Sequence, residues 1–160
     1  NFMPEDTING NVLILDNLQD PGNLGTIIRS GVAFNIDTIV LSDDSVDLYN
    51  PKVVRATEGM LFNLNIIRRN LNEFLPVLKN LGYKIIGTDV NKGIDIRNIS
   101  NANIAIVIGN EGSGMKEETK KFCNEFINIK MNPNCESLNA GVCASIIMYE
   151  VNHEWNGLYW

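Results

Sequence analysis

The sequence contains one histidine and only three cysteines, and this scarcity excludes several kinds of site. Cys123, Cys135 and Cys143 form no C-x-x-C pair, so together with His153 they predict no zinc site and no other metal centre. An odd number of cysteines without paired spacing is typical of a protein of the reducing cytoplasm. Because His153 lies far along an expected terminal helix, a Ser–His pair of the serine-hydrolase kind is not expected either.

Long apolar runs and an excess of basic residues are also missing. No stretch approaches the length of a membrane-spanning helix, and the first residues do not resemble a secretory signal, so we expect a cytoplasmic protein without a membrane partner. With 13 Lys and Arg against 19 Asp and Glu, the net charge is −6, and the basic footprint of a self-sufficient nucleic-acid binder is absent. RNA affinity would then need a local basic patch or another domain. The candidates for such a patch are Arg29, Arg55, Arg68 and Arg69.

Two common phosphate-binding loops are absent as well. The chain has no G-x-x-x-x-G-K-[ST] sequence, and the glycines of residues 109–114 follow the pattern G-x-x-G-x-G. The first strand-to-helix turn lacks G-x-G-x-x-G, so neither an ATPase loop nor an ordinary dinucleotide site is supported. Taken alone, residues 109–114 could equally be a glycine-rich turn without a ligand.

The chain does contain a regular alternation of short apolar runs and helical patterns. The expected strands are residues 11–16, 38–42, 64–68, 83–88, 104–108 and 126–131. The expected helices are one that starts at residue 24, followed by residues 51–61, 71–81, 116–124 and 137–155. This alternation, with strands rich in Val, Ile and Leu, predicts one α/β domain over residues 1–160 with a mostly parallel sheet and helices on both faces.

Three loops in this arrangement follow strands and carry polar residues, namely 17–25, 109–115 and 131–139. Ligands of such sheets bind at the carboxyl ends of the strands, so we expect these loops to meet. The third loop enters the last helix through the sequence ESLN, residues 136–139. A helix start offers unpaired backbone N–H groups and a partial positive charge, which suit acceptor atoms of a ligand.

Together these segments resemble the three motifs of the SpoU-type RNA ribose 2′-O-methyltransferases, a TrmH-like family of the SPOUT class. Residues 20–30 (DPGNLGTIIRS) resemble the first motif, residues 107–114 (VIGNEGSG) the second, and residues 136–139 (ESLN) the third. Residues 54–59 (VRATEG) resemble a segment between the first two. The three motifs occur in the family's order, and the resemblance covers residues 11–150.

The resemblance implies an enzyme that transfers a methyl group from S-adenosylmethionine to the ribose 2′-OH of a nucleotide in rRNA or tRNA. S-adenosylhomocysteine would be the second product, and no metal would be needed. It also implies a C-terminal trefoil knot, a rare exception to unknotted topology, and a homodimer with each site near the subunit interface. Because many members carry a separate N-terminal RNA-binding domain and this chain begins at Asn1, we expect an upstream domain to be missing. The alternative is a non-catalytic module of the same fold that binds RNA or S-adenosylmethionine.

The resemblance assigns roles residue by residue. The implied catalytic residues are Arg29, Asn23, Glu111, Ser137 and Asn139. The implied donor-binding residues are Thr88, Gly109, Asn110, Glu111, Gly112, Ile129, Met131, Ser137 and Leu138. A single helix arginine is usually just solvated, so the role of Arg29 depends on this combination. Because a guanidinium is always protonated, we expect Arg29 to stabilise negative charge on the ribose oxygen rather than accept its proton.

The C-terminal part departs from the family pattern in places. Lys130 stands where proline is usual, residues 132–134 (NPN) replace a more glycine-like turn, and Ala140-Gly141 replaces a frequent valine-serine pair. These changes affect the expected shape of the adenine pocket, although small residues still permit close helix packing.

The last helix has two apolar stripes, which suggest burial on two sides. One stripe is Leu138, Val142 and Ile146, and the other is Ile147, Val151 and Trp155. We expect one stripe to pack on the sheet and the other to form a dimer contact. Full burial of this helix within one monomer is the alternative.

Overall fold

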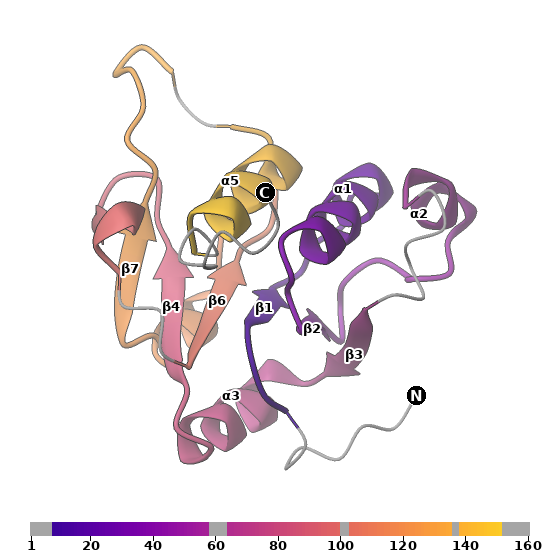
Figure 1. Ribbon diagram of the computed structural model, residues 1–160, viewed down its shortest axis with the longest axis horizontal. Helices are drawn as coiled ribbons and strands as arrows, with labels where there is room; N and C mark the ends of the chain where they lie inside the picture. Colours follow the sequence, from indigo (N-terminus) through magenta and orange to yellow (C-terminus); the bar gives the residue numbers. More distant parts are fainter. Residues whose placement is uncertain (1–7, 58–63, 100–102, 136–137, 152–160) are drawn as a thin grey trace, which may run out of the picture.

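The computed structural model describes residues 8–57, 64–99, 103–135 and 138–151 (Figure 1). It contains a seven-stranded sheet with the order β3-β2-β1-β6-β4-β7-β5, and every neighbouring pair of strands is parallel. The strands are β1 (Val12–Leu15), β2 (Thr38–Ser42), β3 (Asn65–Arg69), β4 (Lys84–Thr88), β5 (Ile94–Asp95), β6 (Ile104–Ile108) and β7 (Glu125–Asn128). The parallel sheet predicted from the alternating pattern is therefore confirmed.

The middle of the sheet is formed by apolar strands that are buried on both faces. Every residue of β1, β2 and β6 is buried. In β1, Leu13 is aligned with Ile39 of β2 on one side and with Ile106 of β6 on the other. Continuous Val, Ile and Leu runs are expected in this environment, because helices cover both faces of a parallel sheet.

Helices cover both faces, as predicted. On one face, α1 (Pro21–Ala33), α2 (Pro51–Ala56) and α5 (Ala140–Val151) share a core with Leu13 and Leu15. On the other face, Val12 and Ile14 pack with Phe74 of α3 (Leu71–Asn80), and the short helix α4 (Glu117–Lys120) contacts α3. Figure 1 shows α5, α1 and α2 in a row on the upper side of the molecule as drawn, with α3 on the lower side.

Helix α1 packs closely against both of its neighbours in this row. A Cβ atom added to Gly25 would overlap Ala56 of α2, so these helices touch where Gly25 lacks a side chain. On the other side, a Cβ atom on Gly141 of α5 would lie 3.2 Å from the Thr26 side chain. The Ser30 hydroxyl of α1 also hydrogen-bonds to the Ser145 hydroxyl of α5 at 2.6 Å. The expectation that Ala140-Gly141 permits close packing is therefore confirmed.

Several predicted boundaries were wrong. Helix α1 begins at Pro21 rather than residue 24, because the Asp20 side chain caps it and Pro21 suits the first turn. Helix α5 begins at Ala140 rather than residue 137, and β7 ends at Asn128 rather than residue 131. Strand β5 was not predicted, since two residues are too few to show a period.

Within these described ranges, no helix is long and apolar enough to cross a membrane. The segment that would be threaded to make a knot includes residues 136–137, which are outside the described residues. The trefoil knot therefore stays a prediction.

Candidate functional site

A cavity of about 440 Å³ opens at the carboxyl edge of the sheet, where β4, β6 and β7 end. Its walls come mainly from residues 88–91, 108–115, 127–129 and 131 and from α5. Every predicted donor-binding residue that the structure describes lines it: Thr88, Gly109, Asn110, Glu111, Gly112, Ile129, Met131 and Leu138. Ser137, the remaining one, lies outside the described residues. The cavity has the size usual for small-molecule and cofactor sites.

The cavity has one largely apolar side. Ile129 and Met131 follow β7, Leu138 lies just before α5, and Cys143 and Ile147 are on α5. Burial raises the pKa of the Cys143 thiol, so this side chain is a neutral thiol near pH 7. A flat ring could be accommodated between these two groups of apolar side chains.

The opposite side is the glycine-rich loop after β6, and internal hydrogen bonds set its shape. Asn110 and Gly114 exchange two backbone hydrogen bonds of 3.0 Å, which close the loop. The Asn110 side-chain oxygen also accepts from the backbone N–H of Gly112 at 2.8 Å and of Ser113 at 3.0 Å. A Cβ atom on Gly109 would overlap the backbone of Met115, so only glycine fits there. The loop therefore presents backbone close to the cavity.

The same loop is bound to the loop that precedes α1. The Glu111 carboxylate accepts hydrogen bonds from the backbone N–H of Asp20 at 2.8 Å and of Gln19 at 3.1 Å. The Asn110 side-chain amide donates to the Asn17 carbonyl at 2.7 Å. The first two motifs thus meet, as expected from their place at strand ends. Glu111 reaches the cavity but uses its carboxylate to hold the neighbouring loop.

Asn139 caps the last helix. Its side-chain oxygen accepts from the backbone N–H of Gly141 at 2.8 Å and of Val142 at 3.2 Å. It does not line the cavity, whereas the preceding residue, Leu138, does. Its cap fixes where α5 begins and hence the position of the cavity wall that α5 supplies.

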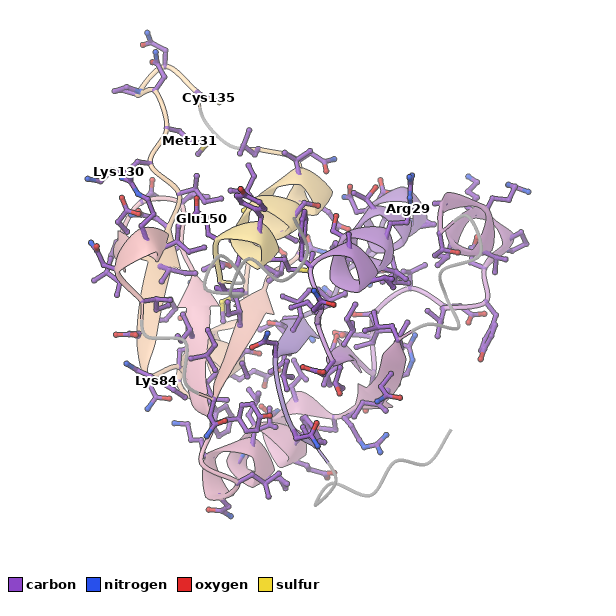
Figure 2. All side chains as sticks on the ribbon, viewed as in Figure 1. Arg29, Lys84, Lys130, Met131, Cys135 and Glu150 are labelled. Carbon is purple, nitrogen blue, oxygen red and sulfur yellow. The ribbon has the colours of Figure 1, made fainter. Side chains whose placement is uncertain are left out.

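Asn23 and Arg29, the other predicted catalytic residues, lie on α1 and do not line the cavity. Asn23 is only 7% exposed, and its side-chain amide makes no hydrogen bond to another described residue, although its backbone N–H donates to the Asp20 carboxylate. A buried amide without a partner is costly and often marks a functional position. Arg29 is exposed, and Figure 2 shows it on α1, across α5 from Met131.

The role considered for Arg68 is corrected by its contacts. Its guanidinium donates to the carbonyls of Ser42 at 2.9 Å, Ser45 at 2.8 Å and Val46 at 2.7 Å. Arg68 therefore stabilises the loop after β2 rather than offering its charge to RNA. The sequence does not show which acceptors surround an arginine in the folded protein, so this structural role of Arg68 could not be predicted.

The loop held by Arg68 in turn supports the loop after β1. The Ser42 hydroxyl accepts from the Asn17 backbone N–H at 2.8 Å, and the Ser45 hydroxyl accepts from Leu18 at 3.1 Å. Val46 donates its backbone N–H to the Leu18 carbonyl at 2.8 Å. A continuous set of hydrogen bonds thus runs from β3 through two loops to Asn110 and the cavity.

Some cavity residues have no motif and were missed. Asp89, Val90 and Asn91 line the cavity directly after β4, as Cys143 does from α5. The available signal was position alone, because residues 89–91 follow the carboxyl end of a predicted strand. Within the described part of the chain, no group of three or more His, Cys, Asp or Glu could hold a metal ion.

Comparison with known proteins relates this chain to one family. The profile of the SpoU rRNA Methylase family matches residues 10–149. The 23S rRNA (guanosine(2553)-2'-O)-methyltransferase RlmP of Bacillus subtilis (strain 168) is 36% identical over 141 residues, which are 88% of this chain and 57% of that protein. The chain thus spans little more than half the length of this relative.

Two solved structures show the same fold. An rRNA methyltransferase from Sinorhizobium meliloti with bound AdoMet (S-adenosylmethionine) superposes with a TM-score of 0.87 at 28% identity, over 94% of this chain and 60% of that one. The SpoU methyltransferase AviRb from Streptomyces viridochromogenes, in complex with AdoMet, gives a TM-score of 0.82 at 27% identity, over 91% and 61% of the two chains.

Proposed function

Because the chain belongs to the SpoU rRNA Methylase family, we propose that it is the catalytic domain of an RNA ribose 2′-O-methyltransferase that uses S-adenosylmethionine. Its substrate would be a nucleotide of rRNA or tRNA, and it would act in the cytoplasm. The observation that carries the proposal is the cavity at the carboxyl edge of the sheet. All eight described residues that the family resemblance assigns to the methyl donor line this one cavity.

The cavity residues fit such a donor. The apolar side chains of Ile129, Leu138 and Ile147 suit the faces of an adenine ring. The backbone beside Gly109, where a Cβ atom cannot fit, suits polar atoms of the donor at close range. Thr88 donates its hydroxyl to the Val107 carbonyl at 2.9 Å, so it shapes the cavity floor rather than offering this proton to a ligand.

When bound, S-adenosylmethionine supplies a methyl group that its sulfonium makes electrophilic, so the protein mainly has to align the ribose oxygen. The ribose hydroxyl is a weak acid, and charge develops on its oxygen as the proton leaves. Arg29 can stabilise this charge or hold a neighbouring phosphate, since its guanidinium donates in a fork. The buried amide of Asn23, which has no partner in the described residues, is available to hydrogen-bond the ribose.

A homodimer is part of the proposal. In α5, Ile147 and Val151 are buried in the monomer core, whereas Val142 is 46% and Tyr149 58% exposed. An apolar helix with exposed Val and Tyr side chains is suited to contact with a second subunit. The same helix supplies one wall of the cavity, so a dimer contact there would lie close to the site.

Two measurements test the proposed function. Isothermal titration should detect S-adenosylmethionine binding, and tritium from its methyl group should be incorporated into unmodified 23S rRNA or tRNA. The product should be a 2′-O-methyl ribose, and that position should be unmethylated in RNA from cells without the gene. Arg29→Ala should lower the single-turnover rate by about 100-fold or more with little effect on donor binding. Donor binding without transfer to either RNA would support the non-catalytic alternative instead.

A further inference from the structure

The surface of α2 combines positive charge with an exposed aromatic ring, although the whole chain has a net charge of −6. Lys52 and Arg55 are exposed on α2, Tyr49 just before it is 66% exposed, and Val54 is 41% exposed. We propose that Tyr49, Lys52 and Arg55, here called the α2 surface, bind the substrate RNA beyond the methylated nucleotide. This inference rests on the proposed function and adds where the RNA lies.

The fold directs these side chains outward. Val53 is fully buried, and Ala56 packs against Gly25 of α1, so the remaining side of the short helix faces solvent. The Asn50 side chain accepts the Lys52 backbone N–H at 2.9 Å and fixes the start of the helix. The α2 surface is therefore held in place by its neighbours.

Its charges are not neutralised by any carboxylate among the described residues. Lys52 and Arg55 make no ion pair among the described residues, whereas Lys84, Arg97, Lys116, Lys120 and Lys130 all lie within 4 Å of a carboxylate oxygen. No Asp or Glu occurs in residues 48–57, and Glu58, the next acid along the chain, is outside the described residues. The nearest acid before it, Asp47, uses its carboxylate to accept the Tyr49 backbone N–H at 3.0 Å. Unpaired Lys and Arg side chains favour a phosphate backbone.

The position suits an RNA strand that enters the proposed site. Helix α1 lies between α5, which borders the cavity, and α2 (Figure 1). The axes of packed helices are about 8–10 Å apart, so α2 lies about two helix spacings (α5 to α1 and α1 to α2) from the wall of the cavity. Arg29 lies one turn after Gly25, on the side of α1 that faces α2. RNA bound at the cavity and across α1 would reach the α2 surface next.

Tyr49 adds a contact that charge alone does not provide. Bases stack on exposed aromatic rings without sequence preference, and such rings accompany positive grooves in proteins that bind single-stranded nucleic acid. A single-stranded segment beside the target nucleotide, rather than a duplex, is therefore the expected occupant. RNA-binding proteins commonly read loops and bulges in this way.

The test compares two charge-reversed variants. Lys52→Glu/Arg55→Glu changes the α2 surface, and Lys79→Glu/Lys121→Glu is the control on the opposite side of the sheet. Lys79 and Lys121 are also exposed and make no ion pair among the described residues. Each of the two substitutions in a variant changes the net charge by −2, so the net charge of both variants is −10 instead of −6. Affinity for unmodified 23S rRNA made by in vitro transcription is measured by filter binding over a range of salt concentrations.

We expect Lys52→Glu/Arg55→Glu to weaken RNA binding by about tenfold or more. The control variant should weaken RNA binding by about twofold or less. The neutral variant Lys52→Gln/Arg55→Gln should lower the slope of log affinity against log salt by about 2. S-adenosylmethionine binding and the thermal midpoint should be unchanged in all three. Tyr49→Ala should weaken RNA binding by about tenfold, and Tyr49→Phe should restore it because the ring is kept.

If both charge-reversed variants weakened RNA binding equally, the effect would be one of general charge, and the proposed role of the α2 surface would be wrong. Unchanged RNA binding by Lys52→Glu/Arg55→Glu would also contradict this role. It would indicate instead that the α2 surface contacts another protein. These results are independent of catalysis, because binding is measured without the methyl donor. Failure of the wild-type protein to methylate any RNA would instead overturn the proposed function.

Discussion

The Glu111 carboxylate accepts the backbone N–H of Asp20 at 2.8 Å and so joins two loops that are 91 residues apart in the sequence. Asp20 in turn caps α1 through the backbone N–H groups of Gly22 and Asn23. The loop that lines the cavity is thereby connected to the helix that carries Arg29. Donor binding and the position of α1 are expected to depend on this one carboxylate.

Replacing Glu111 with Ala should weaken S-adenosylmethionine binding by about tenfold and lower the free energy of unfolding by about 1 kcal/mol. The reason is that two backbone N–H groups lose their acceptor and the loops separate. Isothermal titration and urea unfolding measure the two effects. Glu117→Ala, another exposed glutamate near the same loop, is the control and should keep donor affinity. Equal donor affinity in both variants would contradict a bracing role for Glu111.

Gly109→Ala should abolish donor binding or destabilise the protein by about 1–3 kcal/mol, because the new methyl group would overlap the Met115 backbone. Gly112→Ala is a matched control, since its Cβ would lie 3.6 Å from the Asn110 side-chain oxygen, at an ordinary van der Waals distance. The thermal midpoint of Gly112→Ala should be close to that of the wild type. A Gly109→Ala protein with normal stability and donor affinity would show that the loop can open without cost.

Arg68→Ala should lower the free energy of unfolding by about 2–3 kcal/mol, because several carbonyls of the loop after β2 lose a charged donor. Arg68→Lys should recover only part of this loss, since an ammonium cannot match the fork of a guanidinium. Urea unfolding provides the measurement, and Lys79→Ala serves as the control for removal of one exposed cation. If Arg68→Ala matched Lys79→Ala, the hydrogen bonds of Arg68 would contribute little.

The cysteines should differ in their reaction with iodoacetamide at pH 8. Cys135 is exposed, whereas burial raises the pKa of Cys143 and raises that of Cys123 to about 11. Thiolate is the reactive form, so Cys123 and Cys143 should react slowly at pH 8 and faster as the pH is raised. Mass spectrometry of the alkylated peptides gives the order. S-adenosylmethionine should slow Cys143 further, because Cys143 lines the cavity, and should leave Cys123 unchanged. Equal slowing of both would indicate a general effect on the fold.

Val142→Asp should convert the proposed homodimer to a monomer, because the exposed part of α5 would carry a charge that a second subunit has to desolvate. Multi-angle light scattering at micromolar concentration measures the change. Val54→Asp is the control, since Val54 is similarly exposed but lies on α2. A wild-type protein that is already monomeric would remove the dimer from the proposal.

The sequence predicted most of the sheet because buried parallel strands require apolar residues on both faces. Residues 104–108 (IAIVI) show this directly, and β6 is found there. Strand β5 has only Ile94 and Asp95, and its place comes from pairing with Ile127 and Asn128 rather than from its own pattern. The start of α1 was missed because apolar spacing begins at Leu24, while the cap is polar.

The site was predictable to a similar extent. Glycine-rich and polar motifs indicated the loop after β6, and those residues line the cavity. Contacts that depend on tertiary structure were not visible, such as the carbonyls around Arg68 and the place of Cys143 in the cavity wall. For Asn139, the sequence predicted a position at a helix start, but only the structure shows its capping hydrogen bonds.

The close contact between Thr26 of α1 and Gly141 of α5 has a consequence for sequence variation. The place where a Cβ of residue 141 would lie is 3.2 Å from both Cβ and Cγ2 of Thr26 and 3.1 Å from the Asn139 side-chain oxygen, so an added methyl group requires these neighbours to shift slightly or one of them to be smaller. Substitutions at 26 and 141 should therefore be coupled. Thr26→Ser removes the Cγ2 contact and keeps the Cβ contact, so Gly141→Ala should be tolerated somewhat better together with it than alone. Related sequences with a larger residue at position 141 should show the compensating change on α1.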